Sequence, residues 1–296
     1  MESPFGSRRP RHSSFNSDRS DDSYYDYCLW RYNPVTPPEK KLRSANLLYH
    51  SFEVARAPES AYGLVQAIRH GIGTCNTVWG VKQIGGELRW EFYFYDYRRR
   101  ARERSATRVL QIMRPFIPCR VVTNERLNYF MFSLDVNGDL LKGTADLEEV
   151  HLYIGNPGSA VSSGICYSVT VDRAKLENFY FFFDAKRLDE IVGKINSSMF
   201  FDTTSADINR LLWPELRNCG VIVVANKQQN DALYFSRITI DQLLFFLKKM
   251  GYPSSHVAFV EANRNRLDHL LYDVGIDYRM EGTELRILKS GYYGTF

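Results

Sequence analysis

The feature that most constrains the fold is a series of short segments with strand-like alternation, joined in pairs by turn residues. Successive side chains of a strand point to opposite faces of its sheet. In residues 90–97, Trp and Phe alternate with Glu and Tyr, so one face is apolar and the other is polar and rich in tyrosine. Residues 130–136 and 150–155 show a similar division between an apolar face and a more polar one. These strands are therefore expected to bury one face and to present a polar face, often with tyrosine, on the other side.

Five pairs of such segments follow one another, and helical patterns separate most of them. The pairs cover residues 74–97, 129–155, 164–184, 221–237 and 273–296. The sequence predicts helices over 59–70, 99–114, 204–213, 239–250 and 254–271, and one that begins near 186. Strands joined by short turns form an antiparallel meander, and a sheet of about ten strands tends to curl or close. The expected fold class is thus α+β, with about ten antiparallel strands in five hairpins closed into a barrel and helices around it.

The tyrosine content favours a barrel over a sandwich. A sandwich would place the apolar faces together and leave the polar, aromatic faces in water. The chain has 19 Tyr, and so many half-apolar rings are costly to expose. In a barrel with helices outside, the same rings line an enclosed lumen, so we expect the tyrosines to face inward.

The domain organisation follows from composition. Residues 1–26 contain many Ser, Arg and Asp and few aliphatic residues, which predicts a disordered tail. Residues 27–58 include the Pro-rich stretch Asn33–Pro38 and are predicted to form a linker or strap, followed by a single barrel domain over 59–296. The sequence has no run of 18 apolar residues, no apolar leader and no Cys-x-x-Cys among five cysteines. We therefore expect a cytoplasmic protein without a membrane partner.

Several functional classes lack their motifs. The sequence has no phosphate-binding Gly-x-x-x-x-Gly-Lys, no Gly-x-Gly-x-x-Gly after a strand, no His-Glu-x-x-His and no Gly-x-Ser-x-Gly. A net charge of +4 over 296 residues argues against nucleic acid as a partner. The basic run Arg98–Arg104 is interpreted as the solvated start of a helix, and its alternative is a docking patch for an acidic peptide or a nucleic acid.

In architecture the chain resembles the ABBA aromatic prenyltransferases, the PT-barrel family. The resemblance covers about residues 59–296 and rests on helix–hairpin–helix units, about ten antiparallel strands and a tyrosine-rich interior, without a compact motif. The peptide prenyltransferases of cyanobactin pathways are nearest in size. Residues 156–163 depart from the pattern, because this connection is too short for a helix.

The resemblance implies a transferase that moves an allylic prenyl group from its diphosphate to an aromatic acceptor. The acceptor is a Trp or Tyr side chain of a peptide, or a small indole or phenol. Such a reaction needs positive charge on the diphosphate, from Lys, Arg or Mg²⁺. It also needs aromatic faces around the allyl cation and a base near the acceptor ring.

The candidate site residues are carried over by strand position only. The diphosphate-binding candidates are Lys227, Arg279 and Lys289, with Arg89 next, and Lys82 is a further cation on the first hairpin. The candidate base is Glu91. The candidates for shielding the cation are Tyr93, Tyr153, Tyr180, Tyr234 and Tyr292. No residue is assigned as a metal ligand, although the spacing of Asp273 and Asp277 places both acids on one face of a strand.

Each candidate also has a structural interpretation. Cations near strand ends often lie in solvent, where they discourage edge-to-edge pairing. Glu91 can pair with a cation on the neighbouring strand, and a tyrosine stripe can be wall packing. The alternative to the enzyme is therefore a non-catalytic ligand-binding barrel or a protein-interaction module.

Overall fold

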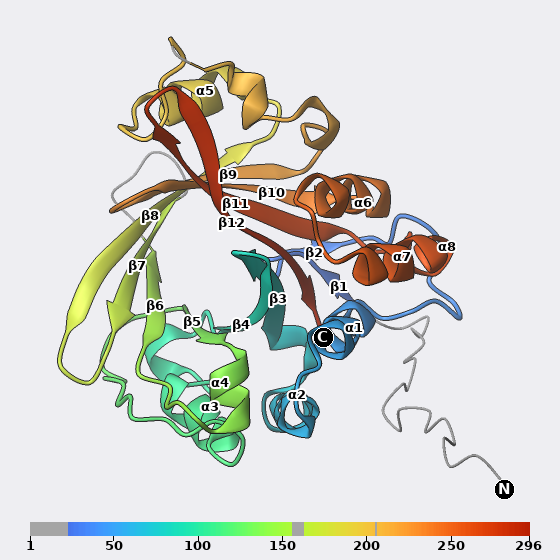
Figure 1. Ribbon diagram of the computed structural model, residues 1–296. Helices are drawn as coiled ribbons and strands as arrows, with labels where there is room; N and C mark the ends of the chain where they lie inside the picture. Colours follow the sequence, from blue (N-terminus) through green and yellow to red (C-terminus); the bar gives the residue numbers. More distant parts are fainter. Residues whose placement is uncertain (1–22, 156–162, 205) are drawn as a thin grey trace, which may run out of the picture.

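The computed structural model describes residues 23–155, 163–204 and 206–296, and these form a closed barrel (Figure 1). Its ten strands are β3 (Thr77–Ile84), β4 (Glu87–Tyr95), β5 (Met131–Val136), β6 (Val150–Gly155), β7 (Ser163–Val169), β8 (Ala174–Asp184), β9 (Val221–Lys227), β10 (Asp231–Ile238), β11 (Tyr272–Glu281) and β12 (Glu284–Thr295). Each strand pairs antiparallel with the next, and β12 pairs with β3 to close the barrel. The predicted fold class is confirmed.

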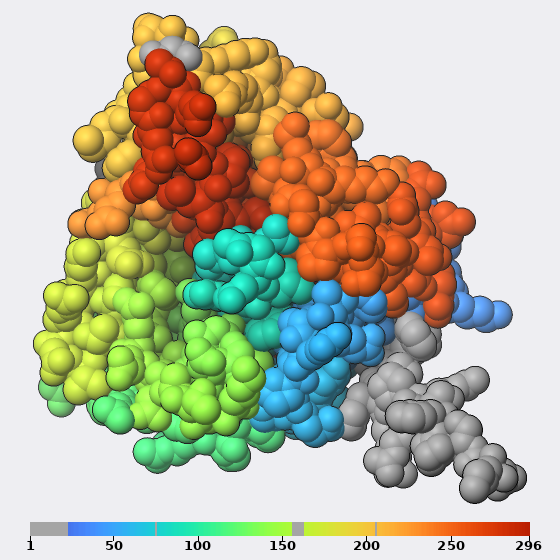
Figure 2. Space-filling view, viewed as in Figure 1, coloured from blue at the N-terminus to red at the C-terminus, as the bar shows by residue number. Residues whose placement is uncertain are grey.

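The helices of the described chain lie outside the barrel. They are α1 (Ala45–Ala55), α2 (Glu59–Ile72), α3 (Ala106–Met113), α4 (Gly138–Lys142), α5 (Leu188–Asn196), α6 (Ile240–Lys249), α7 (Ser254–Ala262) and α8 (Arg264–Leu267). Figure 2 shows α1 (blue) and α7 (orange) side by side, although they come from opposite ends of the chain. On the outer face of β8, α5 covers only the end of the strand, where Lys194 Nζ lies 3.9 Å from the centroid of the Phe181 ring. Among the described residues, no helix is both long and apolar enough to span a membrane.

The alternation of the strands separates two apolar clusters. The larger cluster lies between the barrel wall and the helices, where Trp90 of β4 packs against Phe52 of α1 with ring centroids 4.9 Å apart. Trp90 Nε1 also donates a hydrogen bond of 2.8 Å to Ser51 Oγ. The smaller cluster lies inside the barrel and is formed mainly by tyrosines, including Tyr93 and Tyr153. Burial of the outer face explains why the sheet closes with its polar face inward.

The N-terminal part of the described chain forms a strap across one end of the lumen. Residues 23–32 contain two short paired strands, β1 (Tyr24–Tyr25) and β2 (Arg31–Tyr32). Between these strands, Tyr27 places its ring 4.9 Å from that of Tyr93 and 5.1 Å from that of Tyr293. The backbone N–H of Tyr27 donates to Asp273 Oδ2 at 2.9 Å. The strap therefore inserts an aromatic side chain into the lumen from that end.

Several local predictions need correction. Residues 1–22 of the predicted tail lie outside the described residues. Residues 23–26, also predicted as tail, belong to the strap. Asp26 is buried there and forms an ion pair with Arg237. The predicted linker contains helix α1, whose Leu and Phe side chains cover the barrel. The strands β5 and β6 are not joined by a short turn, because α4 lies between them. The side chain of Asn137 caps this helix by accepting hydrogen bonds from two backbone N–H groups. The described residues of 204–213 contain a short 3₁₀ turn at Ile208–Arg210 instead of the predicted helix.

Candidate functional site

The lumen contains a cavity of about 430 Å³ at the end away from the strap. Its side chains form two layers that follow the period of two along each strand. In β4, Glu91 belongs to a charged layer and Tyr93 to a tyrosine layer two residues closer to the strap. In β6, His151 and Tyr153 repeat this order. The polar face predicted from the sequence therefore lines this cavity.

Lys82 on β3 joins two carboxylates of the charged layer. Its Nζ lies 2.6 Å from Glu91 Oε2 and 2.5 Å from Asp135 Oδ1. Burial opposes the charge of Lys82, but the two acids outweigh it and raise the pKa of Lys82 above its ordinary value. The side chain of Asp135 is 58% exposed to the chamber. The lumen walls remove part of its hydration, yet Lys82 lowers the pKa of its carboxyl to about 2. Lys82 and Asp135 are therefore both ionised at neutral pH.

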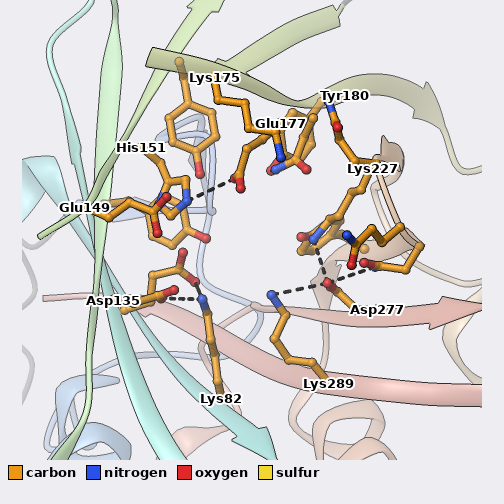
Figure 3. A pocket seen from close by; sticks show the side chains of 18 of the residues that line it. Lys82, Asp135, Glu149, His151, Lys175, Glu177, Tyr180, Lys227, Asp277 and Lys289 are labelled. Atoms are coloured by element: carbon orange, nitrogen blue, oxygen red, sulfur yellow. Dashed lines mark hydrogen bonds and ion pairs between the residues drawn. The ribbon is translucent and has the colours of Figure 1, made fainter. Parts of the chain in front are cut away.

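Asp277 on β11 holds two further lysines at the opposite side of the cavity (Figure 3). Lys227 Nζ lies 2.7 Å and Lys289 Nζ 3.4 Å from Asp277 Oδ2. Asn230 Nδ2 donates to the same oxygen at 3.2 Å. Burial alone would raise the pKa of Asp277, but the two lysines hold it well below the usual range. This arrangement brings two ammonium groups together at one wall of the lumen.

Glycines on neighbouring strands allow two lumen tyrosines to lie flat against the barrel wall. Tyr234 is the register partner of Gly275, and a Cβ at Gly275 would come within 2.3 Å of Cδ1 of Tyr234. Tyr293 has the same relationship to Gly80, where a Cβ would lie 2.6 Å from its Cδ1. The absent side chains leave room for the rings and keep the centre of the lumen open. Burial raises the pKa of Tyr293 well above 10, so its hydroxyl stays protonated.

A smaller cavity of about 210 Å³ lies on the strap side of the tyrosine layer. Its lining is mainly aromatic and apolar, with Tyr95, Phe130 and Phe182 among its residues. Tyr153 and Tyr180 line both cavities. The lumen is therefore divided into a charged chamber and an aromatic chamber by shared tyrosine rings.

The structure brings together most of the residues expected at the site. The charged chamber is lined by Glu91, Lys227, Lys289, Tyr93, Tyr153, Tyr180 and Tyr234. Arg89 and Arg279 lie outside it: both are half-exposed and pair with Glu87 at 3.5 Å and Glu281 at 2.7 Å, respectively. By strand alternation each arginine is on the lumen-facing side of its strand, but it lies too close to the hairpin turn to reach the charged chamber.

Tyr292 is also outside the lumen. It is fully buried between the barrel and the helices, where its hydroxyl lies 2.6 Å from His256 Nε2. Its ring contacts that of Trp79 with centroids 5.9 Å apart. The lumen position belongs to its neighbour Tyr293, because adjacent residues of a strand face opposite sides.

Sequence reasoning missed several cavity residues, including Asp135, Glu149, His151, Glu177 and Tyr293. Asp135 and His151 lie on the polar faces identified in the sequence, and that signal was sufficient to select them. Glu177 gives no such signal, because a β-bulge changes the alternation of β8 at that residue. Asp273, which shares a face with Asp277, lies at the strap end rather than in the charged chamber.

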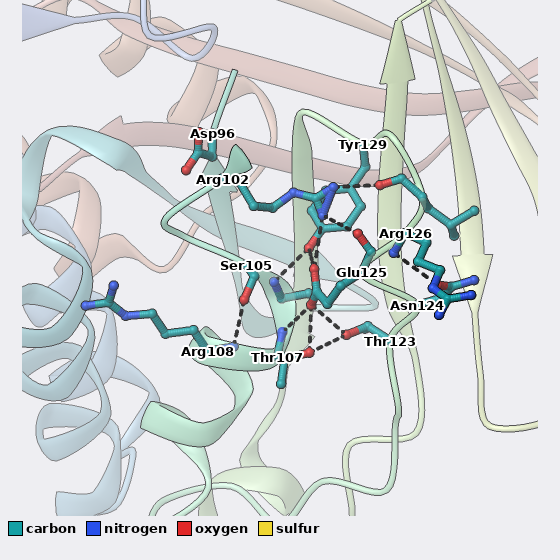
Figure 4. A network of polar contacts seen from close by, with 12 residues as sticks. Asp96, Arg102, Ser105, Thr107, Arg108, Thr123, Asn124, Glu125, Arg126 and Tyr129 are labelled. Carbon is teal, nitrogen blue, oxygen red and sulfur yellow. Dashed lines mark hydrogen bonds and ion pairs between the residues drawn. The ribbon is translucent and has the colours of Figure 1, made fainter. Parts of the chain in front are cut away.

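The basic run Arg98–Arg104 includes one buried structural residue (Figure 4). The guanidinium of Arg102 stacks 3.5 Å from the centroid of the Tyr129 ring and donates to Glu125 at 3.0 Å. Glu125 also accepts from the Tyr129 hydroxyl at 2.7 Å. Arg102 therefore fixes the connection between β4 and β5, whereas Arg99 and Arg100 are exposed.

No protein-family model matches this chain, and no curated protein matches it at a significant level. The interpretation of the site therefore depends on its own geometry and chemistry.

Proposed function

We propose that the protein is an aromatic prenyltransferase, which transfers an allylic group from its diphosphate to an aromatic acceptor inside the barrel. The observation that supports the proposal is a layer of lysines directly beside a layer of tyrosines in one lumen. Ammonium groups suit an anionic diphosphate, and aromatic faces suit an allyl cation. The two layers supply the groups that ionisation of the donor requires.

The diphosphate would bind to Lys227 and Lys289, whose ammonium groups share Asp277, with Lys82 on the other side of the chamber. Lys82 would take the diphosphate-binding role that was expected of Arg89 and Arg279. Positive charge at this position stabilises the leaving group as the bond between the allylic carbon and oxygen breaks. Mg²⁺ is the alternative source of that charge.

The tyrosine layer would shield the allyl cation until the acceptor ring attacks it. Tyr93, Tyr153, Tyr180 and Tyr234 line the chamber, and Tyr293 completes this layer. The strap inserts Tyr27 from the other end, which favours exclusion of water from the cation. A carbon–carbon bond to the ring would then form, and the ring proton would pass to a base. The proposed base is Glu91, which lines the same chamber as Tyr93.

One observation favours the alternative, a non-catalytic ligand-binding barrel. Lys82, Lys227 and Lys289 each have a carboxylate partner in the lumen, so their charges are balanced without a ligand. A diphosphate would have to compete with these acids. A barrel that binds a neutral polar molecule has no such competition.

The test uses the full chain with dimethylallyl or geranyl diphosphate and a panel of Trp, Tyr, indole and phenol acceptors, with products identified by mass spectrometry. Glu91→Gln is expected to reduce product formation at least tenfold, because general-base catalysis contributes about 100-fold or more. Glu87→Gln, on the same strand but exposed, is the matched control. Absence of product from the folded protein would contradict the proposal. Full activity of Glu91→Gln would remove Glu91 as the base.

A further inference from the structure

Three potential metal ligands meet in the wall of the charged chamber (Figure 3). Glu149 directly precedes β6, His151 lies in β6 and Glu177 lies in β8. One ligand atom from each side chain can be chosen so that all three lie within 4.8 Å of one another. His151 Nε2 is 3.1 Å from Glu177 Oε2, and Glu149 is held by a hydrogen bond from Ser168. Three separate positions in the sequence thus converge on one point of the cavity.

A β-bulge directs Glu177 toward this point. Cys166 of β7 pairs with Asn178 of β8, whereas the next residue, Tyr167, pairs with Leu176. Glu177 is therefore the extra residue of β8 and has no register partner. As a result, both Glu177 and Asn178 line the cavity, although adjacent residues of a regular strand face opposite sides. Bulges that redirect a side chain are over-represented beside functional sites.

The charge of the chamber favours an additional cation. Its lining contains five carboxylates, from Glu91, Asp135, Glu149, Glu177 and Asp277, but only four ammonium groups, from Lys82, Lys175, Lys227 and Lys289. The described ion pairs of Lys82, Lys227 and Lys289 go to other acids, and none joins these lysines to Glu149 or Glu177. Glu177 pairs with His151 at 3.1 Å, so a proton on this imidazole and a bound metal ion are alternative ways of balancing the two glutamates.

The donor set identifies the class of ion. Bonds of about 2.1 Å to a shared ion place neighbouring ligand atoms about 3 Å apart. His151 Nε2 and Glu177 Oε2 already have this spacing at 3.1 Å, and a ligand atom of Glu149 lies within 4.8 Å of both. An imidazole nitrogen with two carboxylates suits Mn²⁺, Fe²⁺, Co²⁺ or Zn²⁺ better than Mg²⁺, which prefers oxygen ligands. Three protein ligands in an open cavity leave coordination positions for water or a substrate oxygen.

We propose that Glu149, His151 and Glu177 form a binding site for a divalent transition-metal ion in the wall of the lumen. The ion balances the charge of the two glutamates when His151 is neutral, and it offers open coordination positions toward the centre of the chamber. Its use in binding the diphosphate rests on the proposed function, whereas metal binding itself does not.

The experiment titrates the metal-free full chain with Mn²⁺ alone and measures the free ion by electron paramagnetic resonance. One equivalent of Mn²⁺ is expected to bind, and His151→Ala and Glu177→Gln are each expected to weaken binding at least tenfold. Mg²⁺ is expected to compete at least tenfold more weakly than Zn²⁺. Glu148→Gln and His70→Ala, at exposed positions, are the matched controls and should bind Mn²⁺ as the unmodified chain does.

Two results would overturn the metal site: no stoichiometric Mn²⁺ binding, or binding that the His151 and Glu177 variants leave unchanged. Circular dichroism checks that each variant is folded. If either variant fails to fold, Glu149→Gln is used, because that residue is exposed and its change leaves the barrel wall intact. No diphosphate is present, so a failed transferase assay and a failed metal titration are separate outcomes.

Discussion

Lys227 of β9 and Asp277 of β11 form an ion pair of 2.7 Å, although β10 lies between their strands in the barrel. Lys289 of β12 approaches the same carboxylate at 3.4 Å. The charged layer therefore links strands that share no backbone hydrogen bonds. Because the side chains of this pair are only 11% exposed, its loss affects both the stability and the chemistry of the lumen.

Lys227→Met is expected to lower the free energy of unfolding by about 2 kcal/mol. Removing one partner of an isolated buried ion pair costs more, but here Lys289 remains beside Asp277 and still balances its charge. Under the proposed function, binding of inorganic pyrophosphate also weakens at least tenfold. Urea denaturation measures the first effect and isothermal calorimetry the second. Lys248→Met is the matched control, because its ion pair with Glu261 is exposed and such pairs contribute less than about 1 kcal/mol. Equal losses in the two variants would show that the lumen pair has no special role.

Gly275→Ala is expected to displace the ring of Tyr234 into the lumen, because a Cβ would lie 2.3 Å from Cδ1 of that ring. The cavity becomes smaller, and binding of any lumen ligand weakens. The combined variant Gly275→Ala/Tyr234→Ala should recover part of the lost affinity, because the displaced ring is then absent. Fluorescence titration with one aromatic acceptor compares the four proteins of this cycle. Additive effects in the cycle would contradict direct contact between the two residues.

The sequence predicts the face on which a residue lies better than its depth in the lumen. Alternation places Arg279 on the same face as Asp277, but Arg279 lies two residues nearer the β11–β12 turn and pairs with Glu281 instead. Depth depends on how far each strand extends beyond its neighbours, which only the three-dimensional register defines. The bulge at Glu177 likewise leaves no sequence signal. By contrast, Lys289 and Tyr292 are three residues apart, and residues separated by an odd number of positions face opposite sides of a regular strand. Alternation alone therefore indicates that these two residues cannot both face the lumen.

Tyr292→Phe tests that assignment. The hydroxyl of Tyr292 lies 2.6 Å from His256 Nε2 in a fully buried contact between β12 and α7. Its removal leaves a buried imidazole nitrogen unpaired, which is expected to cost about 1–3 kcal/mol. Pyrophosphate and acceptor binding should remain unchanged, because Tyr292 is outside the lumen. Thermal and urea denaturation measure the stability, and a loss of ligand affinity in the folded variant would return Tyr292 to the site.

Asp273 gives the strap a defined dependence on pH. Burial and the nearby Asp26 raise the pKa of Asp273 from 3.8 to about 7, against hydrogen bonds from Ser236 and the backbone of Tyr27 and Arg237. Between about pH 4 and 7 the folded protein holds a proton on Asp273 that the unfolded chain has lost. Asp273 therefore stabilises the fold less as the pH rises through that range. Above about pH 7 the carboxylate is ionised in the folded protein as well, and the full cost of burying its charge applies.

Other acids with lowered pKa values, such as Asp135 and Asp277, act in the opposite direction, so the measurement compares two proteins. The free energy of unfolding is determined between pH 4.5 and 8.5 for the unmodified chain and for Asp273→Asn. As the pH rises, the free energy of unfolding of Asp273→Asn is expected to increase relative to that of the unmodified chain, because the amide carries no charge to bury. Asp172→Asn, at an exposed position, serves as the control. Parallel curves for the unmodified chain and Asp273→Asn would show that Asp273 does not titrate in this range.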